Sequence, residues 1–534
     1  MQSSVRWKFI HSDFTIPRSL MRQATRVLIA ATLLLVCREA AAHSMGVVYN
    51  LPIPFWMYAF AASAALALSF LVVGFFVSGQ NAARNFRSVQ FAVPEAMAPG
   101  AALWVGRALS VFLLLLTVLT ALFGTSNSFA NFSVTFFWIV FVLGLAYLTA
   151  LIGDVYALVN PWRVLCDWIE TLRPGTFRGR FSYPRWLAYY PALALYMAFI
   201  WLELFPHASP RTLGMVLLAY SVLNIVAAAL VGADAWFRHG ELFAVFFRLI
   251  GKIAPIEYLS GKTRASGTSI RLRQPFIGLI EESADHPSIL LFVLFMLSST
   301  AFDGVHETLP WVQVFWKTIY PALAALIARP YPFFVGLYYN WQWAMLWLSP
   351  FVYLAIYLFF VWLMKLVTGS HRAVRDLALQ FAHCLIPIAF VYNVTHYYTL
   401  LVTGAPAMLR LISDPFGVGW NLFGTARIVQ QPITLLAGGV WHTQVGLMLF
   451  GHVVSVYLAH AQALRIFPGS RQALRSQLPM LVLMVAFTTV GLWILSLPIT
   501  GGQVQDPAPM SSDAHPWSST ATMTAFASLT EEHG

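Results

Sequence analysis

Long runs of apolar residues separated by short polar segments make up most of this chain. A helix rises about 1.5 Å per residue, so about 20 apolar residues cross the roughly 30 Å hydrocarbon core of a bilayer. The pattern predicts ten membrane spans after a cleavable signal peptide, at 52–77, 101–123, 133–158, 186–206, 212–236, 286–307, 343–366, 377–402, 435–460 and 479–498. A weaker apolar stretch at 315–328 is expected at the interface. The predicted fold class is therefore all-α, a polytopic transmembrane helical bundle.

Composition supports this interpretation. Hydrophobic residues make up 59% of the 534 positions and charged residues only 10%, far below the roughly 25% usual in soluble domains. Aromatic residues make up 15%, and many tryptophans stand at the ends of apolar runs, as expected for rings at the headgroup level. These values exclude a soluble globular protein and make the lipid bilayer the expected partner.

The two ends of the chain are predicted to lie outside the bundle. From Met21 onward, Arg22 and Arg26 precede the apolar run VLIAATLLLV, which is too short to span, and three alanines at 40–42 follow it. This is the pattern of an N-terminal extension with a signal peptide, and cleavage after Ala42 would make His43 the mature N-terminus. Residues 43–498 would form the membrane domain, and 499–534, rich in Ser, Thr, Pro and Ala, a flexible tail.

Basic residues predict the orientation. The net charge is +11, and 20 lysines and arginines fall on one set of loops against five on the opposite set. Because positively charged loops remain in the cytoplasm, we expect a multi-pass protein of the bacterial inner membrane with both mature termini periplasmic. The rich loops are 78–100, 159–185, 237–285, 365–376 and 461–478. No nucleic acid partner is expected, since no recognisable binding motif accompanies these residues.

Histidines within the spans are the first candidates for chemistry. The apolar stretch 381–401 carries His383 near one end and His396 near the other. Thirteen residues of helix separate them by roughly 20 Å and turn them to different sides, so they cannot share one site. Each imidazole needs a partner from a neighbouring segment.

Five ionisable residues are predicted to gather at the outer level of the membrane. Asp303, His306 and Glu307 are spaced i, i+3 and i+4 and would share one helix face, while His396 and His442 come from two later spans at the same depth. Imidazoles with carboxylates suit a divalent metal ion such as zinc, manganese, iron or cobalt. The alternative is ordinary hydrogen bonding of each histidine to a nearby group. Ionisable residues in a membrane are costly enough that function is the starting hypothesis.

Four blocks of sequence carry a resemblance to a known family: HSMGVVYNLPIPFWMYAFAASAALALSFLVVG, AFDGVHETLPW, LIPIAFVYNVTHYY and SDPFGVGWNLFGT. Together they resemble bacterial multi-pass membrane proteins known as fenitrothion hydrolases, and the resemblance extends from about His43 to the last span. It implies hydrolysis of a lipophilic organophosphorus triester, releasing a nitrophenol and a dialkyl thiophosphate. No catalytic motif of that family is available to transfer, so site residues are assigned from depth and chemistry.

A metal-assisted reaction follows from that assignment. A bound metal ion lowers the pKa of water from about 15.7 to near 7, which would supply the nucleophile. His306, His396 and His442 are the expected ligands, with Asp303 as a fourth ligand or as a residue that orients them.

Three further residues have expected roles in this reaction. Glu307 is expected to be the general base, and Tyr397 or Tyr398 to donate to the developing oxyanion. Glu203, also near the outer surface, is a supporting or interfacial carboxylate.

Two other functions remain open from the sequence. A transporter or proton-coupled channel would use the same groups as a relay and predicts polar residues through the full membrane depth, for which Asp154, Asp234, His383 and His452 are available. A haem- or copper-binding membrane subunit would use His396 and His442 as axial ligands. The sequence does not define the oligomeric state.

Overall fold

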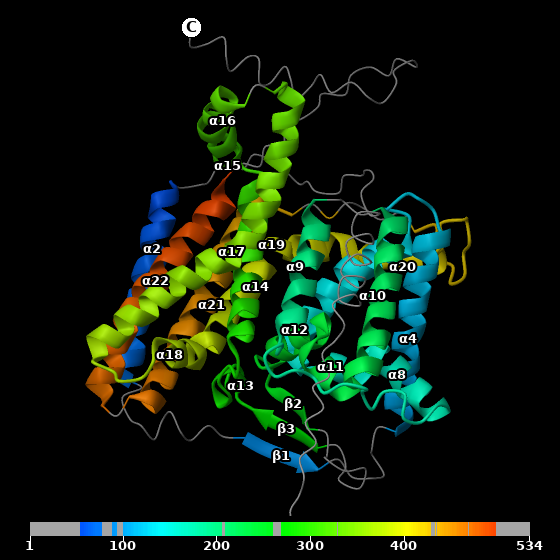
Figure 1. Cartoon of the computed structure of the whole chain (residues 1–534), viewed down its shortest axis with the longest axis horizontal. Coiled ribbons are helices and arrows are strands. Elements are labelled where there is room, and N and C mark those ends of the chain that lie inside the picture. Colours follow the sequence, from blue (N-terminus) through cyan, green and yellow to red (C-terminus); the bar gives the residue numbers. More distant parts are fainter. Residues whose placement is uncertain are drawn as a thin grey trace, which may run out of the picture.

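The computed structural model describes most of the membrane domain (Figure 1). The described residues are 54–76, 88–92, 100–205, 209–259, 269–327, 329–428, 433, 435–467 and 469–497. The predicted signal peptide, His43 and the tail 499–534 lie outside them.

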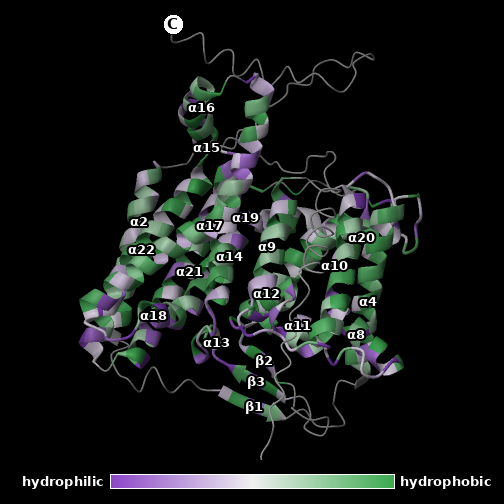
Figure 2. Ribbon diagram, viewed as in Figure 1, coloured by the Kyte–Doolittle hydropathy of each residue, from purple (hydrophilic) through white to green (hydrophobic). Residues whose placement is uncertain are grey.

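Nine helices within the described residues are long and apolar enough to cross a membrane. Figure 2 shows apolar residues along these helices and hydrophilic residues concentrated at the end of the bundle where the strands lie. The all-α polytopic bundle is thus confirmed. The spans are α2 (Phe55–Phe76), α4 (Gly100–Phe123), α5 to α6 (Phe132–Ile152, with the π-helix η2 at Thr135–Gly144), α10 (Pro210–Val231), α14 (Pro287–His306), α17 (Tyr331–Thr368), α18 to α20 (Val374–Ser413), α21 (Ala437–Ile466) and α22 (Ser470–Ser496).

The tenth predicted span, 186–206, is a shorter helix. It is α9 (Tyr190–Leu204), whose 15 residues fall below the length of a full crossing. It nevertheless stands upright between α14 and α10 in Figure 1. The weaker stretch at 315–328 is divided among α15 (Leu309–Gln313), η3 (Val314–Ile319) and α16 (Tyr320–Leu326), which lie beside the start of α17.

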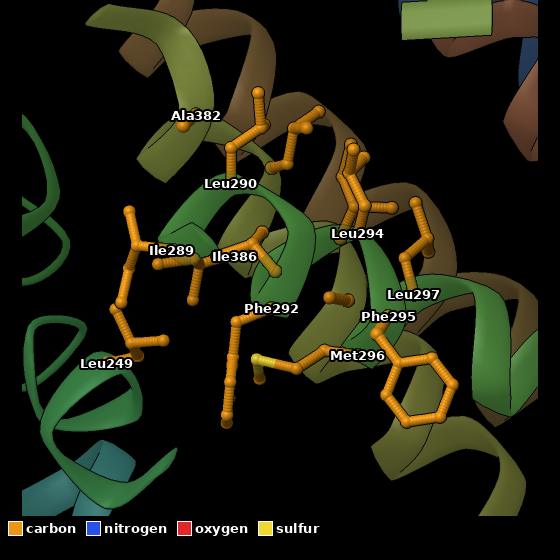
Figure 3. Close-up of a cluster of buried hydrophobic side chains, with 14 of the residues drawn as sticks. Leu249, Ile289, Leu290, Phe292, Leu294, Phe295, Met296, Leu297, Ala382 and Ile386 are labelled. Atoms are coloured by element: carbon orange, nitrogen blue, oxygen red, sulfur yellow. The ribbon is translucent and has the colours of Figure 1, made fainter. Parts of the chain in front are cut away.

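Helix α14 is the centre of the bundle. Of its apolar window 89% is buried, against 22% for α2 and for α10, which face outward. Its run ILLFVLFML is apolar on every side, as expected for a helix enclosed by other helices. Figure 3 shows Leu290, Phe292 and Phe295 within a continuous apolar cluster that includes residues of neighbouring helices. Helices α9, α17, α19 and α22 all pack against it.

The expected continuous span at 377–402 is interrupted. Pro387 lacks an N–H and is favoured in the first turn of a helix, and a new helix begins just before it, at Ile386. His383 consequently lies in a 3-10 turn and His396 on the following α-helix. The segment consists of α18 (Val374–Phe381), η4 (Ala382–Leu385) and α19 (Ile386–Gly404), followed by η5 (Ala405–Ala407) and α20 (Met408–Ser413).

A small sheet at one end of the bundle was not predicted. Strand β3 (Ser269–Arg273) pairs antiparallel with both β1 (Ser88–Ala92) and β2 (Ile256–Leu259). The sheet joins two loops, 78–100 and 237–285, that charge had assigned to the same side of the membrane. Short helices lie at the same end (Figure 1): α8 (Pro161–Leu172), α11 (Ala233–His239), α12 (Leu242–Gly251) and α13 (Gly278–Glu281). A further short helix, α7 (Tyr156–Val159), precedes α8.

Candidate functional site

Asp303, in the last turn of α14, is the centre of the candidate site. Its Oδ2 atom lies 2.8 Å from Nε2 of His396 and accepts a hydrogen bond of 2.5 Å from the hydroxyl of Tyr397. The side chains of Asp303 and His396 are 7% and 21% exposed. A buried carboxylate is stable only when it is paired and hydrogen-bonded, and α19 supplies both partners from consecutive residues.

His306 and Glu307 lie next to this group but are not on one continuous helix face with Asp303. Helix α14 ends at His306, and Glu307 already has non-helical backbone angles. Nδ1 of His306 is 2.9 Å from the backbone oxygen of Asp303 and 3.9 Å from its Oδ1, and Nε2 is 3.9 Å from Oε1 of Glu307. The expected spacing therefore brings the three residues close together, although the helix end turns Glu307 toward the surface, where 41% of its side chain is exposed.

Gly304 allows a third helix to approach the site. A Cβ atom at this position would lie 2.6 Å from Cγ2 of Ile494 on α22, which is closer than real Cβ atoms are found. The same position lies 3.8 Å from Cε1 of His396 and from the hydroxyl oxygen of Tyr392. Helices α14, α19 and α22 thus meet beside the carboxylate of Asp303.

A small cavity adjoins this carboxylate. Its volume is about 30 Å³, enough for about two water molecules. It lies between η2, α9, α12, α14 and α19. Apolar side chains form much of the wall, and the polar lining residues are Tyr196, Glu203, Ser299, Thr300, Asp303, Asn393 and Tyr397.

Glu203 joins Asp303 in this cavity from α9. It lines the cavity together with Tyr397, whose hydroxyl donates to Asp303. Glu203 was expected to be a supporting or interfacial carboxylate; it lines the cavity with Asp303, and its role stays a prediction.

Sequence reasoning missed four polar lining residues, Tyr196, Ser299, Thr300 and Asn393. The available signal was a polar residue inside an otherwise apolar span, which is itself unusual. Serine and threonine are poor indicators because their hydroxyls commonly bond the preceding turn of their own helix. Thr300 does so, since it donates to the backbone oxygen of Met296.

His442 and Tyr398 have their described contacts elsewhere. Nδ1 of His442 bonds the backbone oxygen of Gly438, and its exposed ring packs edge-on against Tyr58 at 6.3 Å between ring centroids. The hydroxyl of Tyr398 donates to the backbone oxygen of Val440. The expected convergence of His442 with His306 and His396 is therefore not found in this arrangement.

The candidate metal ligands do not fit a metal ion as they are arranged. No group of three or more His, Cys, Asp or Glu side chains in the described part of the chain is positioned to hold one. The Nε2 atom of His396 is engaged by Asp303, and Nδ1 of His306 by a backbone oxygen. A divalent metal ion stays a prediction, and it would require these side chains to turn away from their present partners.

Comparisons with protein-family models, with curated proteins and with solved structures give no match for this chain.

Proposed function

We propose that this protein is a membrane-embedded hydrolase in which Asp303 and His396 activate a water molecule. The observation that supports this most directly is the 2.8 Å contact between Nε2 of His396 and Oδ2 of Asp303, next to a cavity with space for water. The proposed substrates are neutral, lipophilic organophosphorus triesters of the fenitrothion type, which the sequence resemblance suggests. Such molecules dissolve in the bilayer and can approach a site near its surface from the side.

The hydrogen bond to Asp303 determines which nitrogen of His396 can act as a base. A carboxylate accepts only, so Nε2 carries the hydrogen and Nδ1 carries the lone pair of the neutral ring. Nδ1 can then take a proton from water as the water oxygen attacks phosphorus, and Asp303 stabilises the imidazolium that forms. The bond from phosphorus to the aryl oxygen breaks, and the nitrophenolate leaves with little need for an acid.

Tyr397 acquires a positioning role in this proposal. Its hydroxyl already donates its hydrogen bond to Asp303. Tyr397 therefore holds this carboxylate in place and does not donate to the developing oxyanion. Glu307 is an alternative base, since it is more exposed and lies 3.9 Å from His306. Tyr398, bonded to a backbone oxygen, is the weaker candidate for an oxyanion donor.

The cavity is large enough for water but too small for the substrate. Pockets that enclose drug-sized ligands have volumes of about 300 to 1,000 Å³. The cavity beside Asp303 is about 30 Å³, so it accommodates water and not the triester. The triester would bind on the exposed side of His396, or between helices that separate as it enters.

The experiment is nitrophenol release by membranes containing the full chain. Asp303→Asn and His396→Gln should each lower kcat by about 10²- to 10⁴-fold, the usual contribution of general base catalysis. His442→Ala, which changes an exposed histidine outside the group, is the matched control and should retain activity. Release by both variants at the parent rate and equal expression would refute the proposed centre.

Two treatments separate the remaining alternatives. A chelator should leave turnover unchanged if Asp303 and His396 act alone, whereas loss of turnover together with loss in His306→Ala and His442→Ala would support a metal ion. A visible absorption spectrum tests haem or copper. If the parent protein releases no nitrophenol, transport becomes the favoured function.

A further inference from the structure

A second cavity lies deeper in the bundle, between α14, α17, α19, α21 and α22. Its volume is about 20 Å³, above the roughly 10 to 15 Å³ that one water molecule needs. Most lining residues are apolar, but Tyr353, Tyr392 and His452 are not. A wholly apolar cavity stays dry, whereas a cavity with polar partners, such as this one, holds water.

Two polar atoms of this lining are buried without a partner. Among the described residues, neither the hydroxyl oxygen of Tyr392 nor Nε2 of His452 has a hydrogen bond. The two residues are 4% and 1% exposed. Buried polar atoms are nearly always satisfied, so both point to a small polar ligand that lies between them.

The hydrogen-bonding roles of these atoms are complementary. Nδ1 of His452 lies 2.8 Å from the backbone oxygen of Met448, which accepts only, so Nδ1 carries the hydrogen and Nε2 is an acceptor. The hydroxyl of Tyr392 can donate. One water molecule can therefore accept from Tyr392 and donate to His452.

We propose that this cavity is a binding site for one buried water molecule in the middle of the bundle, held by Tyr392 and His452. The water accepts a hydrogen bond from the hydroxyl of Tyr392 and donates one to Nε2 of His452, so both buried atoms are satisfied at once.

Tyr392 connects this water site to the outer centre. Its hydroxyl oxygen and Cε1 of His396 both lie 3.8 Å from the Cβ position of Gly304, the residue that follows Asp303. On α19, Tyr392 is one turn before His396, which places both residues on the same side of the helix. The water site and the Asp303 centre are thus one turn of α19 apart.

Polar contacts continue beyond His452 toward the end of the bundle that holds the sheet. Ser455 donates to the backbone oxygen of Cys384 in the 3-10 turn, and Gln462 bonds Gln380 at 3.0 Å. His383 lies 2.8 Å from the backbone oxygen of Glu282. The water site is therefore the central member of a series of buried polar groups.

The experiment measures exchange of the ring Cε1 hydrogen of each histidine for deuterium by mass spectrometry on the full chain in detergent. This exchange requires water at the ring, and it does not depend on whether the protein hydrolyses triesters. His452 should become deuterated over days despite its burial. If His452 stays unexchanged while exposed His442 exchanges, the cavity is dry and the proposal is overturned.

Two variants locate the water. Tyr392→Phe removes the hydroxyl partner, and Ala301→Val fills the cavity from its lining. Each should slow exchange at His452 several-fold and leave His442 unchanged, whereas a variant that fails to fold would speed exchange at His452. Tyr398→Phe, whose hydroxyl bonds Val440 away from the cavity, is the matched control. Exchange at His452 as fast in both variants as in the parent would place its water elsewhere.

Discussion

At the scale of single residues, Tyr397 and Tyr398 are neighbours in the sequence with different surroundings. The hydroxyl of Tyr397 donates to the buried carboxylate of Asp303 at 2.5 Å, whereas that of Tyr398 donates to the backbone oxygen of Val440 at 3.2 Å. A hydrogen bond to a charged group contributes about 1.5 to 3 kcal/mol, and one between neutral groups about 1 kcal/mol. The two tyrosines therefore form a natural pair for mutation.

Tyr397→Phe should lower the melting temperature and the rate of nitrophenol release more than Tyr398→Phe does. The loss at Tyr397 leaves a lone pair of Asp303 unsatisfied in a buried site, at a cost of about 1.5 to 3 kcal/mol. Thermal unfolding in detergent and the membrane assay measure the two effects. Equal effects of the two substitutions would show that the hydrogen bond to Asp303 contributes no more to stability or activity than the bond to Val440.

Asp154, just after the span that ends at Ile152, should respond to pH. Burial raises the pKa of this carboxyl to about 6, although a hydrogen bond from the Ala157 N–H and the charge of Arg248 oppose the shift. Because the folded pKa lies above the unfolded value, stability is greatest at low pH and is lost as pH rises through about 4 to 6.

Asp154→Asn should therefore raise the melting temperature at pH 7.5 and lose this advantage at pH 4. Asparagine is never ionised, and its side-chain oxygen can still accept the bond from Ala157 that the aspartate accepts now. The melting temperatures of parent and variant at pH 4, where both side chains are uncharged, serve as the control. A variant less stable than the parent at pH 7.5 would contradict the expectation.

At the scale of elements, small departures from regular helices position the site. Helix α14 ends at His306, the 3-10 turn before Pro387 sets the start of α19, and Gly304 lets α22 approach. Each departure has a local chemical cause. Together they determine which side chains of α14 and α19 face one another.

Gly304→Ala should destabilise the bundle by about 1 to 3 kcal/mol, the usual cost of overpacking. The new methyl group would meet Cγ2 of Ile494 at 2.6 Å and force α22 away from α14. Gly336→Ala on α17 is the matched control, because no atom lies within 4 Å of its Cβ position. That control should be neutral or slightly stabilising, since alanine favours helix over glycine. Thermal unfolding of the two variants measures the difference.

At the scale of the whole molecule, the sheet holds together loops that are far apart in the sequence. Arg271 contacts both Glu257 and Glu281 at 2.5 Å, and Arg273, with 4% of its side chain exposed, contacts the same two carboxylates at 3.3 and 3.4 Å. The two glutamates neutralise the positive charge of these two arginines in the basic loop. The remaining positive charge is the basis of the proposed orientation.

A cysteine introduced at Val89 should be cytoplasmic and one at Val418 periplasmic. Both positions are exposed, at 54% and 61%, whereas the described native cysteines, Cys166 and Cys384, are buried. A thiol reagent that does not cross membranes should label Val418→Cys in intact spheroplasts and Val89→Cys only after permeabilisation. The reverse pattern would invert the topology and place the Asp303 centre on the cytoplasmic side.

The sequence alone determined the fold class and the residue types available for chemistry. Apolar length predicted ten spans, because hydrocarbon accepts a helix whose backbone bonds within its own segment. Nine of them are helices of spanning length among the described residues, and the tenth is the shorter α9. It also identified Asp303, His396 and Tyr397, since ionisable and polar groups stand out against apolar spans. It did not identify Asn393 as part of the site, or the sheet, whose strands are short and pair across long separations.

Only the tertiary structure decided which of these side chains contact one another. Depth is one coordinate along the membrane normal, so it placed His442 at the level of His396 but could not say which way either ring faces. Helix rotation and packing supply the missing coordinates. They bring His396 and Tyr397 to Asp303, leave His442 exposed beside Tyr58, and place Tyr392 and His452 around one cavity.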